Sequence, residues 1–357
     1  MTDSKATQIS PAGTPALAEL TSIRVGGRPA ELFTAHTRDD LVEHTLEVWR
    51  SGENWMLLSG GSNVVVADDI SDYRVIRVAN RGIEKLSSAN GRVVLRVQAG
   101  ENWDSLVAQT IEWGLSGIEA MSGIPGLVGA GPVQNIGAYG QELSDTLLRI
   151  EFLDYRTEEI GIIDAKDLEF GYRTSAIKRD RPGVVTWVEL ELLDEGGLSR
   201  PLYSTQIAAD LGVEVGEQVP LAEVRKSVLK LRGQKGMLLD PNDPNSVSCG
   251  SFFTNPIVSD KFARTLPFDA PKWEDQDDEG LTVKLSAAWL IEQSGITKGF
   301  RLAGSGAAIS SKHTLAIVNT GNATAADIVQ LAHYVQERVA NQWGVTLVPE
   351  PNLVGEL

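Results

Sequence analysis

The chain has 357 residues, 42% of them hydrophobic, and a net charge of -16 at pH 7. This length predicts two or three domains, and the apolar fraction is too high for a disordered chain. The negative charge argues against nucleic acid or an anionic membrane as a partner, and no apolar run reaches the roughly 20 residues of a membrane span. A single cysteine, Cys249, and an N-terminus without a signal-peptide pattern predict a cytoplasmic protein without an internal disulfide.

The first half of the chain is predicted to form strands with two helices among them. Thr37 is the predicted N-cap of a helix over 38–49, because Asp39 and Asp40 suit the positive end of a helix dipole. A second helix is predicted over 103–113. Apolar patterning predicts strands on both sides of the Gly26-Gly27 turn within 21–33, and at 55–58, 64–66, 73–78, 92–97, 150–154, 159–164 and 184–192.

The second half has clearer helical spacing. Helices are predicted over 221–232 and 286–294. The strongest helical pattern starts at a Thr324 cap and ends at Gly344. With the strand-rich first half, this composition of elements predicts an α+β protein.

Three segments are expected to lie outside these elements. Residues 1–18 are predicted to be a disordered tail. The glycine- and charge-rich segment 194–200 is the predicted domain boundary, and the acidic run 275–279 is predicted to be a solvated loop.

A glycine-rich stretch over 122–140, SGIPGLVGAGPVQNIGAYG, has almost no side-chain bulk. Glycines allow positive φ and close approach of a ligand to main-chain N–H groups, which suits phosphates and other anions. The alternative is an ordinary surface loop, but Gln134, Asn135 and Tyr139 are polar groups able to contact a planar ligand. The stretch therefore predicts a cofactor-binding segment.

A second glycine turn, SGGSN at 59–63, lies between two predicted strands. It lacks the lysine of a P-loop, so it predicts a phosphate-binding turn of another kind, and a tight hairpin is the alternative. Gly304-Ser305-Gly306 does not continue into a G-x-G-x-x-G pattern, which argues against a Rossmann dinucleotide site.

Three further segments carry candidate catalytic side chains. Arg173, beside glycine and tyrosine, can bind a carboxylate through two hydrogen bonds, or it is a surface arginine paired with an acid. Ser251 precedes two phenylalanines, where a hydroxyl in a dry pocket can transfer a proton, or it bonds its own backbone in a turn. Glu350 is held between two prolines, near an active site or in an exit tail.

Other chemistries are disfavoured by the sequence. There is no G-x-S-x-G elbow, which argues against a serine hydrolase. The four histidines are scattered and no Cys/His or paired-carboxylate spacing is present, so no metal site is predicted.

Six segments in family order together resemble the UDP-N-acetylenolpyruvoylglucosamine reductase (MurB) family. They are SGGSN (59–63), SGIPGLVGAGPVQNIGAYG (122–140), FGYRTS (170–175), GSFFTNP (250–256), KLSAAWLIEQSGITKG (284–299) and PEPNLVG (349–355). The resemblance implies an FAD-binding fold of the vanillyl-alcohol-oxidase (PCMH) type in two subdomains, plus an α+β substrate-binding domain. The implied limits are 19–196 for the FAD-binding domain, split near 80, 197–345 for the substrate domain, and 346–357 for a segment returning to the active site.

The resemblance also implies an activity. NADPH would reduce non-covalently bound FAD, and hydride would pass from flavin N5 to the terminal enolpyruvyl carbon of UDP-N-acetylglucosamine enolpyruvate. The product would be UDP-N-acetylmuramate, a peptidoglycan precursor needed for cell-wall growth, cell shape and division. Arg173 and Glu350 would stabilise the enolate, and Ser251 would protonate it. We expect a monomer whose partners are small molecules.

Binding residues are carried over by position. The implied FAD-binding residues are Ser59, Gly60, Gly61, Ser62, Asn63, Ser122, Gly123, Ile124, Pro125, Gly126, Asn135, Gly137, Ala138 and Tyr139. The implied substrate-binding residues are Tyr203, Lys235, Asn255, Lys284 and Gln293, with Tyr203 indicating the family type that has an extra loop over the substrate.

The sequence departs from the family pattern at two positions. Ser59 stands where a third glycine is usual, and Asn352 stands where a basic residue is frequent. Two other classes are weighed against the reductase. A flavin oxidoreductase with another substrate would lack the set of Arg173, Ser251 and Glu350, and a nucleotide-sugar binding module would not need FAD.

Overall fold

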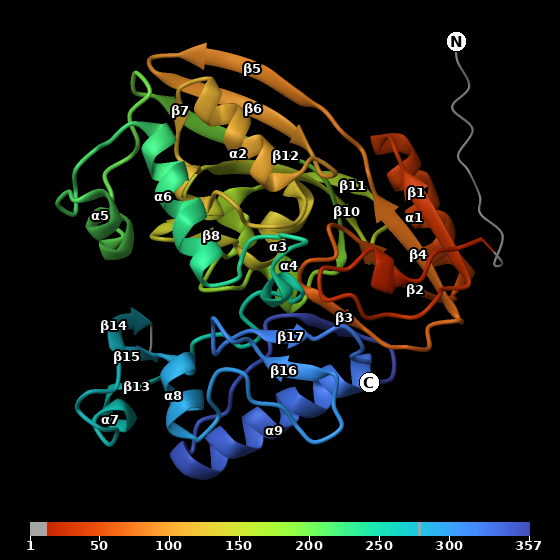
Figure 1. Ribbon diagram of the computed structural model, residues 1–357. Helices are drawn as coiled ribbons and strands as arrows, with labels where there is room; N and C mark the ends of the chain where they lie inside the picture. Colours follow the sequence, from red (N-terminus) through yellow and green to blue (C-terminus); the bar gives the residue numbers. More distant parts are fainter. Residues whose placement is uncertain (1–12, 278–279) are drawn as a thin grey trace. The chain divides into compact units, whose positions relative to one another are not determined.

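The computed structural model describes residues 13–277 and 280–357. The chain forms two compact units (Figure 1). Unit 1 comprises Pro29–Gly61 and Ser71–Gln234 with the described residues up to Pro15, and unit 2 comprises Ala16–Arg28, Ser62–Ile70 and Lys235–Leu357. The predicted boundary near 196 falls inside unit 1.

A three-stranded parallel sheet begins unit 1, in the order β1 (Glu31–Ala35), β4 (Tyr73–Val78), β2 (Asn54–Leu58). Helix α1 (Arg38–Ser51) covers it and starts as predicted, because the Thr37 hydroxyl accepts from the Asp40 N–H while the Asp40 carboxylate accepts from the Thr37 N–H. The carboxyl ends of the parallel strands lie at one edge of this sheet, which is where ligands bind in open parallel sheets.

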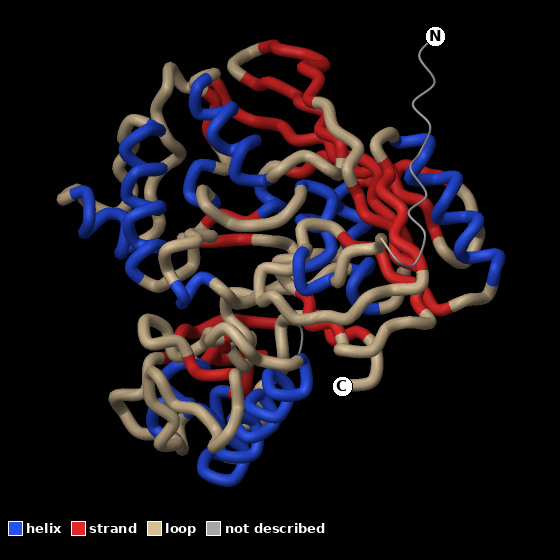
Figure 2. The backbone as a smooth tube through the Cα atoms, turned by 45° about the vertical axis from the view of Figure 1, so that its right-hand side comes forward, coloured by secondary structure: helices blue, strands red, loops and turns tan. Residues whose placement is uncertain are grey.

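A larger antiparallel sheet forms the rest of the core of unit 1, and its strands are drawn in red in Figure 2. Its order is β11 (Ile160–Asp164), β10 (Leu147–Asp154), β12 (Gly183–Asp194), β6 (Arg92–Gln98), β5 (Ile83–Ala89), with β7 (Leu115–Ser116) pairing β12. Helix α2 (Trp103–Glu112) packs on it through Trp103, Leu106 and Val107.

Residues 197–234 also pack within unit 1. Helices α5 (Thr205–Leu211) and α6 (Leu221–Gln234) enclose Ile207, Val224 and Val228 in an apolar cluster with Ala120. This burial explains why the segment after the predicted boundary does not join the second unit.

Unit 2 is built on one large apolar core. Its sheets are β3 (Val64–Val66) with β18 (Asn352–Val354), β16 (Ala307–Ile309) with β17 (Ile317–Asn319), and β13 (Ile257–Ser259), β15 (Gly280–Leu285) and β14 (Lys272–Asp277). Its helices are α7 (Asp260–Ala263), α8 (Ala287–Gln293) and α9 (Ala325–Trp343), and α9 lies along the lower edge of the unit in Figure 1.

Short elements complete the described chain. The 3-10 helices are η1 (Leu17–Glu19), η2 (Glu119–Met121), η3 (Val128–Ala130), η4 (Leu143–Asp145), η5 (Ala165–Leu168) and η6 (Pro244–Ser246). The remaining short elements are α3 (Gly131–Gln134), α4 (Ala176–Arg179), β8 (Gly137–Ala138) and β9 (Gln141–Glu142).

Three sequence predictions need correction. The tail does not extend to residue 18, because Leu17 is fully buried and its N–H donates to Gly27 O at 2.8 Å. The predicted acidic loop begins as strand, since Asp275–Asp277 pair with β15, while 278–279 lie outside the described residues. Two strands were predicted within 21–33, before and after the Gly26-Gly27 turn. The structure has only the second, as β1, because residues 21–30 form turns and irregular chain.

Among the helices that the structure describes, none is both long enough and apolar enough to cross a bilayer.

Helix α9 provides a test of how local chemistry stabilises the fold. The Thr324 hydroxyl accepts from the Asp327 N–H at 3.1 Å, and Gly344 ends the helix in the left-handed conformation. We expect Thr324→Ala to lower the free energy of unfolding by about 1 kcal/mol, measured by urea denaturation. Thr324→Ser keeps the cap hydroxyl and should be close to wild type; equal losses in both variants would contradict the capping account.

Candidate active site

The loop after β2 is the first part of the predicted cofactor site. Strand β2 pairs with β4, whereas β3 pairs with β18, so Ser59–Gly60–Gly61 do not form the tight hairpin considered as the alternative. Ser59, Gly60 and Gly61 belong to unit 1, and Ser62 and Asn63 to unit 2. The turn therefore sits at the carboxyl edge of the parallel sheet, a position that suits a ligand phosphate.

Two glycine segments meet within unit 1. A Cβ added to Gly60 would lie 2.6 Å from the Gly126 Cα and 3.2 Å from the Leu127 nitrogen. Only glycine fits this approach of one backbone to the other. Gly60 and Gly126, distant in sequence, therefore bring the predicted loops 59–61 and 122–140 into direct contact.

The glycine-rich stretch is more ordered than a loop. It contains η3, α3 and β8, with Gly123, Gly126, Asn135 and Tyr139 at positive φ. Some of its polar groups bind within the protein, since the Gly123 N–H donates to Asp104 Oδ1 at 2.6 Å and the Ser122 hydroxyl donates to Glu119 O at 2.7 Å. These bonds fix the shape of the segment. Ligand contacts are therefore expected from its main chain.

Arg173 rests on this segment. Its Nη2 donates to Gly137 O at 2.7 Å and its Nη1 to Asn135 O at 3.4 Å. Asn135 is itself fixed, because its Nδ2 donates to Glu142 Oε2 at 2.9 Å and its Oδ1 accepts from the Ser144 N–H at 3.0 Å. The structure thus brings together Arg173, Asn135 and Gly137, three of the predicted site residues.

A second cation beside the same segment was missed by the sequence analysis. Arg232 Nε donates to Gly123 O at 3.2 Å, and burial lowers the pKa of Arg232 while the phenol of Tyr139 and the Asp104 carboxylate oppose that change. Arg225 binds Asp104 through two nitrogens, at 2.6 and 2.9 Å. Residues 225 and 232 are seven apart on α6, so both arginines lie on the same face of the helix. Helical spacing in the sequence would therefore have identified the pair.

The other two predicted catalytic residues belong to unit 2. The Glu350 N–H donates to Phe252 O at 2.8 Å, and Phe253 pairs with Pro349, so the segments that carry Ser251 and Glu350 run side by side. Phe252 and Phe253 are buried while Ser251 and Glu350 are half-buried. Both side chains therefore stand at the border of an apolar core, where a hydroxyl is partly desolvated.

Cys249, two residues away, is not a candidate nucleophile. Its thiol donates to Val64 O at 3.4 Å, and burial raises its pKa to about 12. A thiol in this state is not deprotonated at neutral pH.

Unit 2 also contains a basic group around predicted Lys235. Burial and the charges of Lys235 and Lys298 lower the pKa of His313 to about 4, while Glu292 opposes the shift. The sequence analysis missed Lys298 and His313. Lysines that depress a neighbouring imidazole in this way form a field that attracts anions, as a diphosphate requires.

The other predicted substrate residues are placed as follows. Asn255 Oδ1 accepts from the Ala287 N–H at 3.0 Å, and Lys284 lies between Ile257 and Trp273 in the β13–β15–β14 sheet. Gln293 is exposed at the end of α8, and Tyr203, in unit 1, is 66% exposed. The exposure of Tyr203 is what a residue that covers a ligand would have before the ligand binds.

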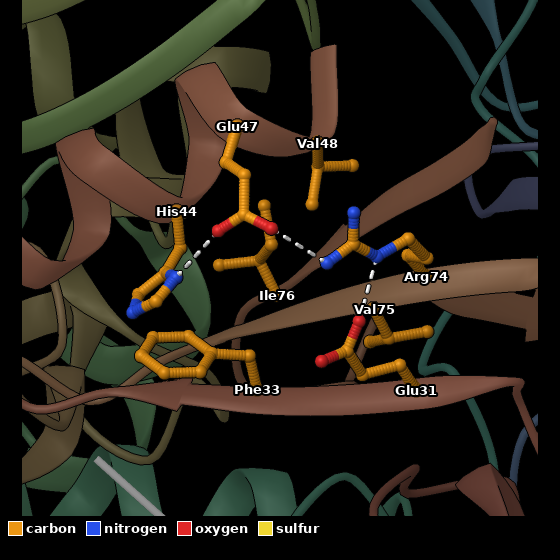
Figure 3. Close-up of a pocket in the computed structure, with 8 residues that line it drawn as sticks. All are labelled: Glu31, Phe33, His44, Glu47, Val48, Arg74, Val75 and Ile76. Atoms are coloured by element: carbon orange, nitrogen blue, oxygen red, sulfur yellow. Dashed lines mark hydrogen bonds and ion pairs between the residues drawn. The ribbon is translucent and has the colours of Figure 1, made fainter. Parts of the chain in front are cut away.

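A cavity of about 160 Å³ in unit 1 contains none of the predicted site residues (Figure 3). It lies between α1 and the first halves of β1 and β4, away from the carboxyl edge of the sheet. Arg74 pairs there with Glu31 at 2.6 Å, Glu47 at 3.1 Å and Glu53 at 3.3 Å, and its hydrogen bond lowers the pKa of Glu47. This ion-pair group ties the helix to the sheet.

Among the described residues there is no group of three or more histidine, cysteine, aspartate or glutamate side chains that could hold a metal ion.

The site has the features of an FAD-binding enzyme. The glycine contact at 60 and 126 places no side chain between the two loops, so a ligand can come close to their main chain. A sequence model of the FAD-binding domain family matches residues 29–160. The chain is an FAD-dependent oxidoreductase, and the predicted α+β fold with an FAD-binding domain is confirmed.

Relatives of known class identify the family. The model of the UDP-N-acetylenolpyruvoylglucosamine reductase C-terminal domain matches residues 242–354. The reductase of Leifsonia xyli subsp. xyli is 53% identical, over 96% of this chain and 98% of the relative, and that of Saccharopolyspora erythraea is 46% identical, over 97% and 96%. The chain belongs to the UDP-N-acetylenolpyruvoylglucosamine reductase (MurB) family.

A solved structure has the same fold. The crystal structure of UDP-N-acetylenolpyruvylglucosamine reductase (MurB) from Thermus caldophilus superposes with a TM-score of 0.65 at 26% identity, covering 98% of this chain and 99% of that chain.

The glycine contact predicts a sharp effect on cofactor binding. In Gly60→Ala the new methyl group meets the Gly126 backbone, so the two segments must separate, and we expect FAD to bind at least about tenfold more weakly. The flavin-to-protein ratio of the purified variant measures this. Gly161→Ala, where a Cβ meets nothing within 4 Å, is the control and should keep its flavin; full flavin in Gly60→Ala would contradict the contact.

The basic group predicts a pH dependence of stability. Because the pKa of His313 falls from 6.5 to about 4 on folding, the unfolded chain binds more protons between these values, and stability is lost as pH falls through this window. Each pKa unit is worth about 1.4 kcal/mol, so His313 should lower the free energy of unfolding of the wild type by up to about 3 kcal/mol across this window. His313→Gln should lack that fall. Urea denaturation from pH 7 to pH 4 measures it.

His333→Gln, at an exposed position of α9, is the control for this titration. An equal pH dependence in wild type and His313→Gln would show that His313 does not contribute.

Proposed function

We propose that the protein catalyses the NADPH-dependent reduction of UDP-N-acetylglucosamine enolpyruvate to UDP-N-acetylmuramate, a step of peptidoglycan precursor synthesis. The single observation that carries the proposal is the presence of Arg173, Ser251 and Glu350 in the family's motifs, on a chain that belongs to the reductase family over nearly its full length. FAD, when bound, would supply the hydride for the terminal enolpyruvyl carbon, with NADPH as the proposed source of that hydride.

Arg173 stabilises negative charge on the substrate. Hydride addition to the terminal carbon of the enolpyruvyl group turns its carboxylate-conjugated carbon into an enolate. A guanidinium held by the carbonyls of Gly137 and Asn135 is already oriented, so it gains interaction as this charge develops and lowers the barrier.

Ser251 completes the reaction by donating its proton to the carbon of the enolate. A serine is a weak acid, so the transfer depends on a strongly basic acceptor and a partly desolvated hydroxyl. The position of Ser251 at the border of the Phe252 and Phe253 core supports this role, as does the antiparallel pairing of its segment with the segment that carries Glu350. Glu350 is proposed to act with Arg173 on the substrate carboxylate end.

The nucleotide part of the substrate is proposed to bind through the predicted residues Tyr203, Lys235, Asn255, Lys284 and Gln293. To these we add Lys298 and His313. The support is that the charges of Lys235 and Lys298 both act on His313, because a UDP diphosphate carries two negative charges that two such lysines attract, while the imidazole of His313 stays neutral at neutral pH.

The setting of the enzyme follows from the same proposal. The substrates are small and soluble, and the net charge of -16 disfavours nucleic acid as a partner. We therefore propose a cytoplasmic monomer whose partners are NADPH and the UDP-sugar.

The two half-reactions test the proposal. Anaerobic NADPH should bleach the yellow flavin of wild type and of Ser251→Ala at nearly the same rate, because Ser251 takes no part in flavin reduction. Turnover with the enolpyruvyl UDP-sugar should fall in Ser251→Ala by about 10²- to 10⁴-fold, the usual worth of a proton-transfer group. Stopped-flow absorbance measures both steps.

Thr254→Val is the matched control for that variant. Thr254 lies three residues further along the same segment and its hydroxyl donates to Val348 O at 3.4 Å, so its loss should leave turnover within about threefold. Normal turnover by Ser251→Ala would show that Ser251 is not the proton donor, and a colourless wild-type protein would favour a binding module.

A further inference from the structure

The turn between β8 and β9 contacts the segment that carries Tyr203. Ala138 pairs with Gln141 in this hairpin, so Tyr139 and Gly140 form a two-residue turn. A Cβ added to Gly140 would lie 3.2 Å from the Tyr203 Cβ and 3.9 Å from the Tyr203 carbonyl carbon. The first distance is shorter than ordinary contact between carbon atoms, so the absence of a side chain at 140 allows the segment to lie this close.

The turn has a backbone conformation that is costly for its first residue. The φ angle is +52° at Tyr139 and +85° at Gly140, and two positive φ angles are the pattern of the type I′ turn of short hairpins. Asparagine or aspartate is usual at the first position of this turn, and a bulky residue there is an outlier. Such strain persists only where the surrounding structure holds the residue in place.

Packing holds the strained tyrosine. Tyr139 is half-buried against the apolar cluster of α5 and α6, and Leu202 is one of the buried members of that cluster. Leu202 directly precedes Tyr203 in the chain. Both residues of the turn therefore support the 202–203 segment, Tyr139 through the shared cluster and Gly140 through its contact with Tyr203.

The main chain on both sides of Tyr203 is also fixed. The Leu202 N–H donates to Glu217 O at 3.0 Å, and Leu202 O accepts from the Gly216 N–H at 2.8 Å. Ser204 is the N-cap of α5, and its side chain accepts a backbone N–H of that helix. Leu202 is 5% exposed whereas Tyr203 is 66% exposed. The segment is thus held before and after Tyr203 and presents one aromatic side chain to solvent.

The same hairpin holds the proposed enolate-stabilising arginine. Arg173 Nη2 donates to Gly137 O at 2.7 Å, and Gly137 pairs with Glu142 in β9. Gly137 begins β8, and the turn follows directly after that strand. One short hairpin therefore contacts Arg173 through β8 and the Tyr203 segment through its turn.

We infer that Gly140 is a positioning residue for substrate binding, because the β8–β9 turn sets the place of Tyr203 relative to Arg173. The inference rests on the proposed function, in which Tyr203 covers the UDP-sugar and Arg173 stabilises its enolate. A substrate that contacts both side chains binds tightly only if their separation is already correct, since less order is then lost on binding. Gly140 contributes without touching the substrate.

Gly140→Ala tests the inference in the full-length holoprotein. The new methyl group meets the Tyr203 Cβ and displaces the segment, so we expect the Kd for UDP and the KM for the enolpyruvyl UDP-sugar to rise about tenfold. The kcat should stay within about threefold, because the lost interaction is a binding contact. Calorimetric titration with UDP and steady-state kinetics measure these constants, and the flavin-to-protein ratio should remain that of wild type.

Gly196→Ala is the matched control for backbone strain. Gly196 also lies in unit 1 with a positive φ angle of +67°, and a Cβ there would meet nothing within 4 Å. Both variants place an alanine in the left-handed region and should lower the melting temperature by a similar amount. Only Gly140→Ala should weaken UDP binding.

A double-mutant cycle with Tyr203→Ala separates positioning from general destabilisation. Loss of the phenol ring should by itself raise the Kd for UDP about tenfold. If Gly140→Ala acts by displacing that ring, then adding it to Tyr203→Ala should change the Kd by less than about twofold, because no ring is left to displace. A general loss of structure would weaken binding equally in both backgrounds.

A UDP affinity of Gly140→Ala equal to that of Gly196→Ala would overturn the inference. Additive losses in the double variant, unchanged UDP binding by Tyr203→Ala, or a loss of flavin from Gly140→Ala as large as that from Gly60→Ala would also overturn it. Failure of the wild-type holoprotein to bind UDP or to reduce the enolpyruvyl UDP-sugar would instead refute the proposed function, so the two failures are distinguishable.

Discussion

The approach of Gly60 to Gly126 is the constraint on which the cofactor site of unit 1 depends. It brings the turn after β2 into contact with a stretch some sixty residues later, at a distance that no side chain allows. The stretch is then held by Asp104 and Arg232, and it in turn holds Arg173 through two carbonyls. The position of the proposed enolate-stabilising arginine thus follows from backbone packing.

The proposed chemistry is divided between groups with different physical requirements. Arg173 needs a fixed orientation and a permanent charge. Main-chain carbonyl oxygens orient the guanidinium, and because they are uncharged they do not neutralise it. Ser251 needs partial burial beside an apolar core, which Phe252 and Phe253 provide. Lys235 and Lys298 need only to lie near each other, because a diphosphate is attracted by the field of several cations.

Local signals in the sequence predicted much of this structure. The caps at Thr37 and Thr324 and the strands over 73–78 and 92–97 depend on neighbouring residues alone, and the structure has them. Leu17 and Asp104 were misjudged or missed because their roles come from partners distant in sequence, whereas Arg232 shares a helix face with Arg225 that the sequence analysis did not consider. The roles of Arg173, Ser251 and Glu350 came from family motifs and remain predictions.

A crystal structure of the protein with FAD and the enolpyruvyl UDP-sugar tests the account most directly. The account predicts the FAD pyrophosphate within hydrogen-bond distance of the main-chain N–H groups at 60 and 61. It also predicts the enolpyruvyl carboxylate on Arg173 and the Ser251 hydroxyl within reach of the carbon that receives the proton. A pyrophosphate bound away from the Gly60–Gly126 contact, or a substrate whose enolpyruvyl group contacts neither Arg173 nor Ser251, would contradict it.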